Sequence, residues 1–372
     1  MKVLLVITIE KLAEKLTALN RKLEYCAIAV DQVEPAKEIL LKVGLSPDLL
    51  YPMSELKNCV ESLKYDYVLN VQDTYYGRQI KLFQNYNLQL EKLVSFAGLE
   101  NASNWQTERQ LRYYREHSQE FEMFATGTSP TATAIDIRKF KRKTINFATS
   151  SQDLYYNFRI AKSVISHAKV NNAIRYALIG LSPYSFHFDL SKTFLWRCRL
   201  LPYLIAFNDL HNLSVSADIC REFLSEEWLS KKPSVAKVNI NGVKSQKVME
   251  NPLESNSGII TWKGKYYPET RDENIKILDE YLTLCEENNV RPIMFRVINS
   301  EKYMANFSKN LLEEFNCLVE QACQKHSSAV FIDGWKWNGV TYSDFYDHAH
   351  MNIHGAAKFS AYLNEFIEQL ER

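Results

Sequence analysis

The sequence lacks most of the features that place a chain in a functional class at once. Its seven cysteines are scattered and form no C-x-x-C pair, which argues against a zinc site or disulfide framework and is typical of free thiols in a reducing cytoplasm. No apolar run approaches the about 18 residues expected of a membrane-spanning helix. The net charge is only +1, so no overall field favours nucleic acid or an anionic membrane.

Two phosphate-binding glycine patterns, G-x-G-x-x-G and G-x-x-x-x-G-K-[ST], are also missing, which counts against a nucleotide site. The opening "MKVLLVITIE" has a short apolar stretch with no small-residue cleavage site behind it, and it is typical of a buried strand rather than a signal peptide. We therefore expect a cytoplasmic protein with no nucleic-acid partner, no membrane span, no cofactor and no metal. The oligomeric state stays open.

The chain contains enough apolar sequence for a large core, with 46% hydrophobic and 24% charged residues among 372. Residues 1–120 alternate between strand-like and helix-like runs. This predicts a small Rossmann-like α/β domain with a parallel sheet. Its expected strands are 2–9, 24–31 and 65–73, its expected helices are 35–44 and 77–98, and the polar segment 101–120 is expected to be a connector.

A second α/β alternation covers residues 121–372 and predicts a doubly wound parallel sheet with helices on both faces. We read 191–275 as an insertion between its third and fourth strands, and we expect the insertion to cover the site as a lid. Ligands of such sheets bind at the carboxyl ends of the strands. The expected strands lie within 120–127, 143–151, 173–186, 290–298 and 328–335, and two of the expected helices are 152–169 and 354–370.

The stretch "FATGTSPTATAID" places Gly127-Thr128-Ser129 at one of these strand ends. Glycine permits a tight turn, and the small residues after Ser129 leave its hydroxyl accessible at the start of a helix, whose N-terminus favours negative charge. Ser129 is therefore a candidate nucleophile. The alternative is that Ser and Thr here only cap the helix.

The stretch "YSDFYDHAHMNIHGAAKFSAYL" contains Asp347-x-x-His350 before the last helix. An aspartate at this spacing reaches Nδ1 of the imidazole, fixes its tautomer and leaves Nε2 free to take a proton from Ser129. There are two alternatives: Asp344 takes the place of Asp347 as the partner of His350, or the Asp–His pair is purely structural. Flanking histidines 348 and 354 raise the question of a metal, but no compact carboxylate set accompanies them. Residues 352 and 355 are expected to shape the loop and the helix start.

In combination, the Gly-Thr-Ser turn and the terminal Asp-x-x-His resemble the first and last blocks of the SGNH/GDSL hydrolase superfamily. The likeness covers about residues 121–372 and is nearest to SGNH-like proteins that modify bacterial cell-surface polysaccharides and teichoic acids. It implies a flavodoxin-like three-layer α/β/α fold, with Ser129 as nucleophile, His350 as general base and Asp347 as its orienter.

The sequence departs from the family pattern around the oxyanion. Thr128 stands where the first block usually has aspartate, and Ser150-Ser151 stands where the second usually has glycine. The third block usually offers an asparagine, and this chain offers Ser182, Ser185 and His187. We take Gly127, Ser151, Ser182 and His187 as candidate oxyanion or substrate-binding residues, although His187 also fits an interior histidine.

The resemblance implies a serine esterase or O-acyltransferase of acetyl type, acting on a glycan or glycoconjugate, with a carbohydrate or acylated small molecule as partner. The altered oxyanion residues leave an alternative. In that alternative, the chain is a catalytically weak or inactive SGNH-like binding module in a surface-polysaccharide pathway.

Overall fold

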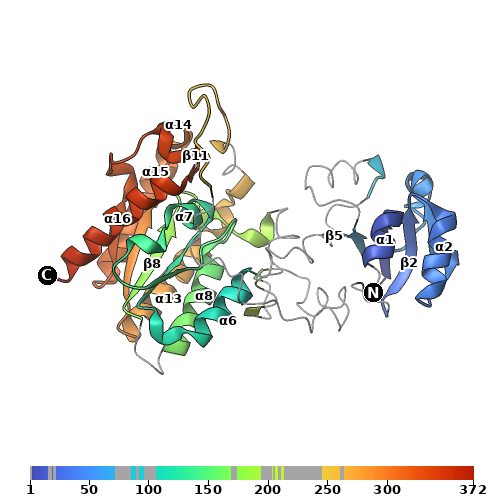
Figure 1. Ribbon diagram of the computed structural model, residues 1–372, viewed down its shortest axis with the longest axis horizontal. Helices are drawn as coiled ribbons and strands as arrows, with labels where there is room; N and C mark the ends of the chain where they lie inside the picture. Colours follow the sequence, from blue (N-terminus) through green and yellow to red (C-terminus); the bar gives the residue numbers. More distant parts are fainter. Residues whose placement is uncertain are drawn as a thin grey trace. The chain divides into compact units, whose positions relative to one another are not determined.

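The fold is described by a computed structural model and comprises two compact units (Figure 1). The first unit is formed by 1–105 and 194–233, the second by 106–193 and 234–372. Most of the predicted insertion 191–275 lies outside the described residues. The structure describes residues 2–15, 19, 22–71, 85–88, 92–95, 106–168, 174–193, 203, 206–207, 211–212, 245–259 and 264–372.

The first unit contains a parallel sheet in the order β3-β2-β1-β4-β5. Its central strands are near-continuous apolar runs, as expected when both faces of a parallel sheet are covered, and β1 is buried from its second residue onward. The sequence-predicted α/β class with a parallel sheet is confirmed here. The strands are β1 (Lys2–Ile7), β2 (Glu24–Val30), β3 (Leu50–Pro52), β4 (Tyr67–Asn70) and β5 (Leu93–Ser95), and the helices include α1 (Ile9–Lys15), α2 (Val33–Lys42) and α3 (Leu56–Cys59).

The helix predicted over 77–98 is wrong at its C-terminal part. Residues Leu93–Ser95 form β5, which pairs in parallel with Val68–Asn70 of β4. A short apolar run containing a β-branched valine fits a strand as well as a helix, and periodicity alone does not separate the two. Pairing with the edge of β4, a non-local interaction, decides the outcome.

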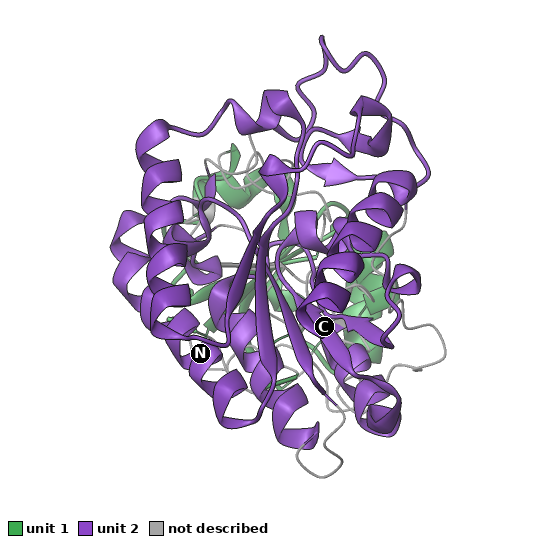
Figure 2. Ribbon diagram, turned by 90° about the vertical axis from the view of Figure 1, so that its left-hand side faces the viewer, with its two compact units in different colours: residues 1–105, 194–233 green, residues 106–193, 234–372 purple. Residues whose placement is uncertain are grey.

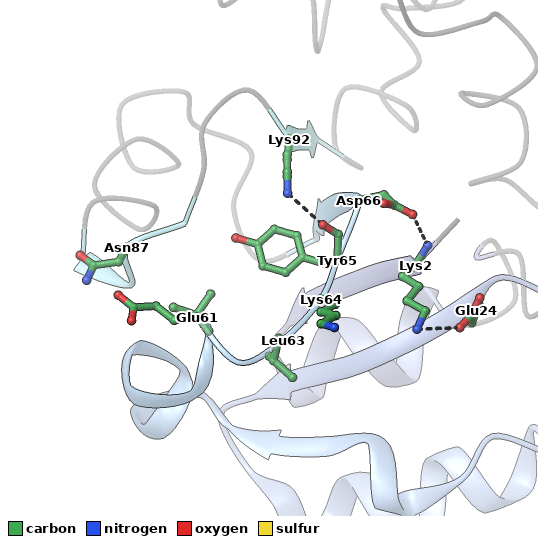
Figure 3. A pocket seen from close by; sticks show the side chains of 10 residues that line it. Lys2, Glu24, Glu61, Leu63, Lys64, Tyr65, Asp66, Asn87 and Lys92 are labelled. Atoms are coloured by element: carbon green, nitrogen blue, oxygen red, sulfur yellow. Dashed lines mark hydrogen bonds and ion pairs between the residues drawn. The ribbon is translucent and has the colours of Figure 1, made fainter.

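A cavity of about 600 Å³ opens in the first unit at the amino ends of its strands (Figure 3). Three of its charged lining residues engage one another: Lys2 Nζ lies 3.5 Å from Glu24, and the Lys2 backbone N–H donates to Asp66 at 2.7 Å. Lys92 Nζ donates to the Tyr65 carbonyl at 3.0 Å. Ligands of doubly wound sheets bind at the opposite, carboxyl edge, so we assign no function to this cavity.

The second unit contains a parallel sheet in the order β10-β9-β8-β6-β7. Numbered within the unit, this is the 2-1-3-4-5 order of flavodoxin-type sheets, whose topological switch point lies between the first and third strands. Here those strands are β6 and β8, so the switch point is the end of β6 that carries Gly127. The strands are β6 (Met123–Thr126), β7 (Thr144–Asn146), β8 (Tyr176–Leu181), β9 (Arg291–Arg296) and β10 (Val330–Asp333), with a separate hairpin of β11 (Phe345–Asp347) and β12 (His350–Met351).

Helices cover both faces of this sheet, which Figure 2 shows nearly edge-on. On one face Met123 and Ala125 pack in a core cluster with Phe359 and Leu363 of α16. On the other, Thr126 Oγ1 lies 3.1 Å from the hydroxyl of Tyr281 in α13. None of the described helices combines the length and apolar character needed to cross a membrane. The helices are α6 (Gln106–Glu116), α7 (Ser129–Ala134), α8 (Leu154–Ala168), α13 (Arg271–Glu287), α14 (Glu301–Met304), α15 (Lys309–Lys325) and α16 (Ile353–Leu370).

The segment 101–120, predicted as a connector, contains helix α6. Gln110 of this helix is buried and donates from Nε2 to the Asn146 carbonyl at the end of β7, at 2.9 Å. Tyr114 is fully buried, and its hydroxyl donates to the carbonyl of Val164 in α8. The second unit therefore begins at residue 106, before the boundary near 120 that the sequence suggested.

His326 ties the end of α15 to α13 through two carboxylates. Its Nδ1 lies 2.8 Å from Glu286 Oε2 and its Nε2 lies 2.9 Å from Asp279 Oδ1, while only 4% of the residue is exposed. Burial alone would lower the pKa of His326, but hydrogen bonds and attraction from Glu286 and Asp279 outweigh it and raise this pKa. With a carboxylate at each ring nitrogen, folding favours the protonated imidazole between α13 and α15.

We expect His326→Gln to destabilise the protein more at about pH 6 than at about pH 9. Because the folded-state pKa is raised, the stabilisation is fully present below the ordinary histidine pKa of about 6.5 and is lost as pH rises through the folded-state value. Asp279 and Glu286 are each about one-third exposed, so we expect on the order of 1–2 kcal/mol at the lower pH. Urea unfolding of both proteins at both pH values measures this, and an equal loss at both would contradict it.

Candidate active site

The end of β6 forms a tight turn that presents Ser129. Gly127 has φ +150°, Thr128 is the N-cap of α7, and Ser129 is the first residue of that helix. A Cβ on Gly127 would collide with Thr131 and would lie 2.9 Å from the carbonyl oxygen of Gly180 at the end of β8. The absence of a side chain at Gly127 thus lets the two strand ends meet closely at the switch point.

The Asp-x-x-His spacing is explained by a two-residue β-hairpin. Asp347 at the end of β11 and His350 at the start of β12 are directly paired across the antiparallel ladder, so their side chains lie together. Oδ1 of Asp347 accepts from the backbone N–H groups of Ala349 and His350 at 2.8 and 2.9 Å. These two hydrogen bonds hold the Asp347 carboxylate in place independently of its contact with the imidazole.

A continuous line of hydrogen bonds connects Asp347, His350 and Ser129. His350 Nδ1 lies 2.9 Å from both carboxylate oxygens of Asp347, and its Nε2 lies 2.9 Å from Ser129 Oγ. Because a carboxylate only accepts, the proton is on Nδ1 and Nε2 accepts from the serine hydroxyl. The structure thus brings together the three side chains that the sequence singled out, in the geometry of a nucleophile, a base and an orienter.

The candidate base, His350, is partly buried. The side chains of His350 and Asp347 are each 14% exposed. The ring of Tyr346 stacks on His350 with centroids 5.4 Å apart and planes 7° apart. Burial and the negative charge of Asp347 raise the pKa of Tyr346 to about 12, so this phenol stays neutral and serves as an uncharged wall beside the imidazole.

Ser151 follows β7 in a conformation that favours glycine. Its φ is +59°, in the left-handed region where non-glycine residues are uncommon, and the residue is 5% exposed. The backbone N–H of Thr149 donates to the Gly127 carbonyl at 3.1 Å, which places this loop beside the β6 turn. Within the described residues neither the Ser129 nor the Ser151 backbone N–H donates a hydrogen bond.

Of the two candidate residues that follow β8, Ser182 and His187, the second has a structural role. The Ser182 backbone N–H donates to Ser185 Oγ at 2.9 Å, while the Ser182 hydroxyl has no hydrogen bond to any residue that the structure describes. His187 is 3% exposed, and its Nε2 lies 2.9 Å from Glu314 of α15. Its ring contacts Tyr266, with centroids 4.8 Å apart. His187 is thus held by α15 as an interior histidine, and no hydrogen bond joins it to Ser129 or His350 in the described part of the chain.

The other polar residues of the terminal block have structural partners. Asp344 accepts from the Thr341 backbone and from Lys358 Nζ, both at 2.8 Å, rather than from His350. Asn352 caps α16 by accepting from the backbone N–H groups of residues 354 and 355, as the sequence predicted. Both ring nitrogens of His348 are engaged, with Ser300 and with the Ser255 carbonyl, so this histidine has no nitrogen free for a metal.

Sequence analysis expected the insertion 191–275 to cover the site as a lid, but it did not single out the segment that contacts Asp347. Residues 245–259 of the insertion pack along the hairpin, and Gly258 lies against Asp347. A glycine in a polar, irregular stretch gave the only signal, and a single glycine in a loop points to no particular contact.

Comparison of the chain with models of known protein families gives no match, and comparison with curated proteins gives no relative. The geometry of Ser129, His350 and Asp347 at the switch point of a parallel sheet is therefore what identifies this as a candidate active site.

Proposed function

We propose that the second unit is an SGNH-type serine esterase or O-acyltransferase that acts on acetyl-type esters of a glycan or glycoconjugate. The observation that carries the proposal is the hydrogen-bonded line from Asp347 through His350 to Ser129 Oγ. The flavodoxin-type strand order and the position of Ser129 after the first strand of the unit support it. The ester and glycan class follow from the resemblance to surface-polysaccharide enzymes.

In the proposed reaction, Ser129 Oγ attacks the ester carbonyl while His350 Nε2 takes the hydroxyl proton. The imidazolium that forms is stabilised by Asp347 at Nδ1. The C–O bond of the ester then breaks, and His350 returns the proton to the departing alcohol. Water or a sugar hydroxyl, deprotonated by the same Nε2, attacks the acyl-enzyme and releases Ser129.

The negative oxygen of the tetrahedral intermediate requires preorganised donors. We assign the backbone N–H groups of Ser129 and Ser151 to this role, because both are available and Thr149 holds the second loop beside Gly127. The left-handed backbone at Ser151 is the conformation for which a glycine is usually selected. Ser151 thus adopts here a backbone conformation that is typical of glycine. The Ser182 hydroxyl is a third candidate donor.

A fluorophosphonate probe tests the proposal directly, because it reacts covalently with serines that are activated by a base. We expect mass spectrometry to find the phosphonate adduct on Ser129 in the wild-type protein and on neither the Ser129→Ala nor the His350→Ala variant. Circular dichroism would show that both variants are folded. Labelling of a different serine, or equal labelling of wild type and Ser129→Ala, would rule out this nucleophile.

A second candidate function is favoured by the residues after β8. No asparagine is present there, and the Ser182 backbone N–H is already used by Ser185. Loss of one oxyanion donor costs on the order of 3–4 kcal/mol of transition-state stabilisation. A chain that binds acylated glycans but catalyses slowly or not at all fits this observation. Glycan binding by a wild-type protein that forms no phosphonate adduct would select this candidate.

A further inference from the structure

Residues 245–259, which we call the strap, run along the hairpin that carries Asp347 and His350. Two of the strap's residues, Met249 and Ile259, are buried, and Met249 belongs to the same core cluster as Phe345 and Met351 of the hairpin. The backbones are joined by hydrogen bonds from Met249 N to Phe345 O (2.8 Å), from His348 N to Ser257 O (3.1 Å) and from Ile353 N to Ser245 O (2.8 Å).

Gly258 is the point at which the strap meets the orienting carboxylate. Its φ is +85°, and a Cβ at this position would lie 2.7 Å from Oδ1 and 3.0 Å from Cγ of Asp347. It would also lie 3.1 Å from the backbone nitrogen of Ala349. Only a glycine therefore lets the strap backbone pack directly on this carboxylate in its present position.

His348 fixes the strap from inside the hairpin turn. It is fully buried, its Nε2 lies 2.9 Å from the Ser255 carbonyl, and its Nδ1 lies 2.7 Å from Ser300 Oγ. Since a carbonyl only accepts, Nε2 carries the proton and Nδ1 accepts from the Ser300 hydroxyl. Lys302 Nζ donates to the carbonyls of Leu253 and Ser255 at 3.0 and 2.7 Å. The strap is thus held in place beside Asp347 by two independent side chains.

We propose that Gly258 is a positioning residue that acts through Asp347. Oδ1 of Asp347 accepts from Ala349 N, His350 N and His350 Nδ1 at once, so a small rotation of the carboxylate weakens all three bonds. Packing of the Gly258 backbone on the carboxylate opposes this rotation. The kinetic consequence of this inference rests on the proposed function, whereas its consequence for the Asp347–His350 hydrogen bond does not.

The kinetic test compares Gly258→Ala with two glycine controls. Gly264 lies in the same insertion, and a Cβ added there would meet no atom within 4 Å. Gly44 has φ +76°, and a Cβ added there would also meet no atom within 4 Å, so Gly44→Ala reproduces the backbone strain without the collision. We expect Gly258→Ala to lower kcat for p-nitrophenyl acetate by about 10²-fold with KM little changed. Gly264→Ala and Gly44→Ala should leave both parameters at the wild-type values.

A double-variant cycle separates action through Asp347 from a general structural effect. In the Asp347→Ala background the carboxylate that Cβ would meet is gone, so Gly258→Ala should cost nothing further in kcat. A Gly258→Ala loss of the same size in both backgrounds would overturn the proposal. Lys302→Met, which loosens the strap without adding atoms near Asp347, should lower kcat in the same direction by about 10-fold. Wild-type kcat in both Gly258→Ala and Lys302→Met would also overturn it.

Proton NMR provides a readout that needs no turnover. A proton shared between His350 Nδ1 and Asp347 gives a strongly downfield signal, which should be present in the wild type and absent from Asp347→Asn. We expect it to be lost or shifted upfield in Gly258→Ala and retained in Gly264→Ala. An unchanged signal in Gly258→Ala means that the positioning inference is wrong. A signal that responds as expected in a protein without esterase activity means that only the proposed function has failed.

Discussion

Ser129→Ala and His350→Ala are each expected to lower kcat for p-nitrophenyl acetate hydrolysis by on the order of 10⁴-fold or more, and the double variant is expected to lose no more than either. Under the proposed function the two side chains act as one unit, since the hydroxyl is a weak nucleophile unless Nε2, 2.9 Å away, takes its proton. Once either partner is removed, the other contributes nothing to acyl transfer. The residual rate then reflects binding and oxyanion donors alone.

Thr133→Ala is the matched control for Ser129→Ala. Thr133 also lies in α7, and its hydroxyl donates to backbone carbonyls of that helix, including the Ser129 carbonyl at 3.1 Å. Its removal deletes a hydroxyl from the same helix without touching His350. We expect wild-type kcat in Thr133→Ala. A Ser129→Ala protein that is folded by circular dichroism and keeps its esterase rate would refute the assignment of Ser129.

Asp347→Asn is expected to lower kcat by about 10⁴-fold, with little change in the folded structure. The asparagine carbonyl can replace Oδ1 as acceptor for the Ala349 and His350 backbone N–H groups. Its NH₂ group then faces Nδ1 of His350 and donates to it. We expect this donor, in the place of Oδ2 at 2.9 Å from Nδ1, to favour the tautomer with the proton on Nε2, which can no longer accept from Ser129.

Asp344→Asn tests whether the loss at Asp347 is specific. Asp344 belongs to the same loop, but its carboxylate is bound by Lys358 and by the Thr341 backbone instead of by His350. Asp344→Asn should lower the melting temperature and leave kcat unchanged. Asp347→Asn should lower kcat and leave the melting temperature nearly unchanged. Comparable effects of the two substitutions on kcat would show that the loop, and not the His350 partner, determines activity.

The sequence predicted the three side chains of the candidate site because each lies in a short local pattern. Gly127 and Ser129 follow a recognisable strand, and the Asp347–His350 spacing reflects a hairpin that brings paired residues together. The strands of a parallel α/β unit all end at one edge of the sheet. Local pattern and topology therefore made residues 221 positions apart candidates to meet. The resemblance to the SGNH/GDSL superfamily was needed to prefer them over the capping and structural alternatives.

Features that depend on non-local packing could not be predicted from the sequence. Leu93 and its neighbours are a strand only because β4 offers an edge to pair with. The left-handed backbone of Ser151 is imposed by the loop around it, and serine gives no sign of it in sequence. The contact of Gly258 with Asp347 joins a polar insertion to a distant hairpin. No periodicity or residue spacing in the sequence indicates the Ser151 backbone conformation or the Gly258–Asp347 contact.

The order of Ser129, Asp347 and His350 along the chain has a consequence for biosynthesis. Ser129 precedes His350 by 221 residues, and all five strands of the second sheet lie before the hairpin. A nascent chain that has emerged from the ribosome as far as β10 carries the proposed nucleophile but neither the proposed base nor its orienter. Under the proposed function such a chain is chemically inert towards esters. Esterase activity is then expected only after the hairpin, whose β12 contacts α7, has folded into place.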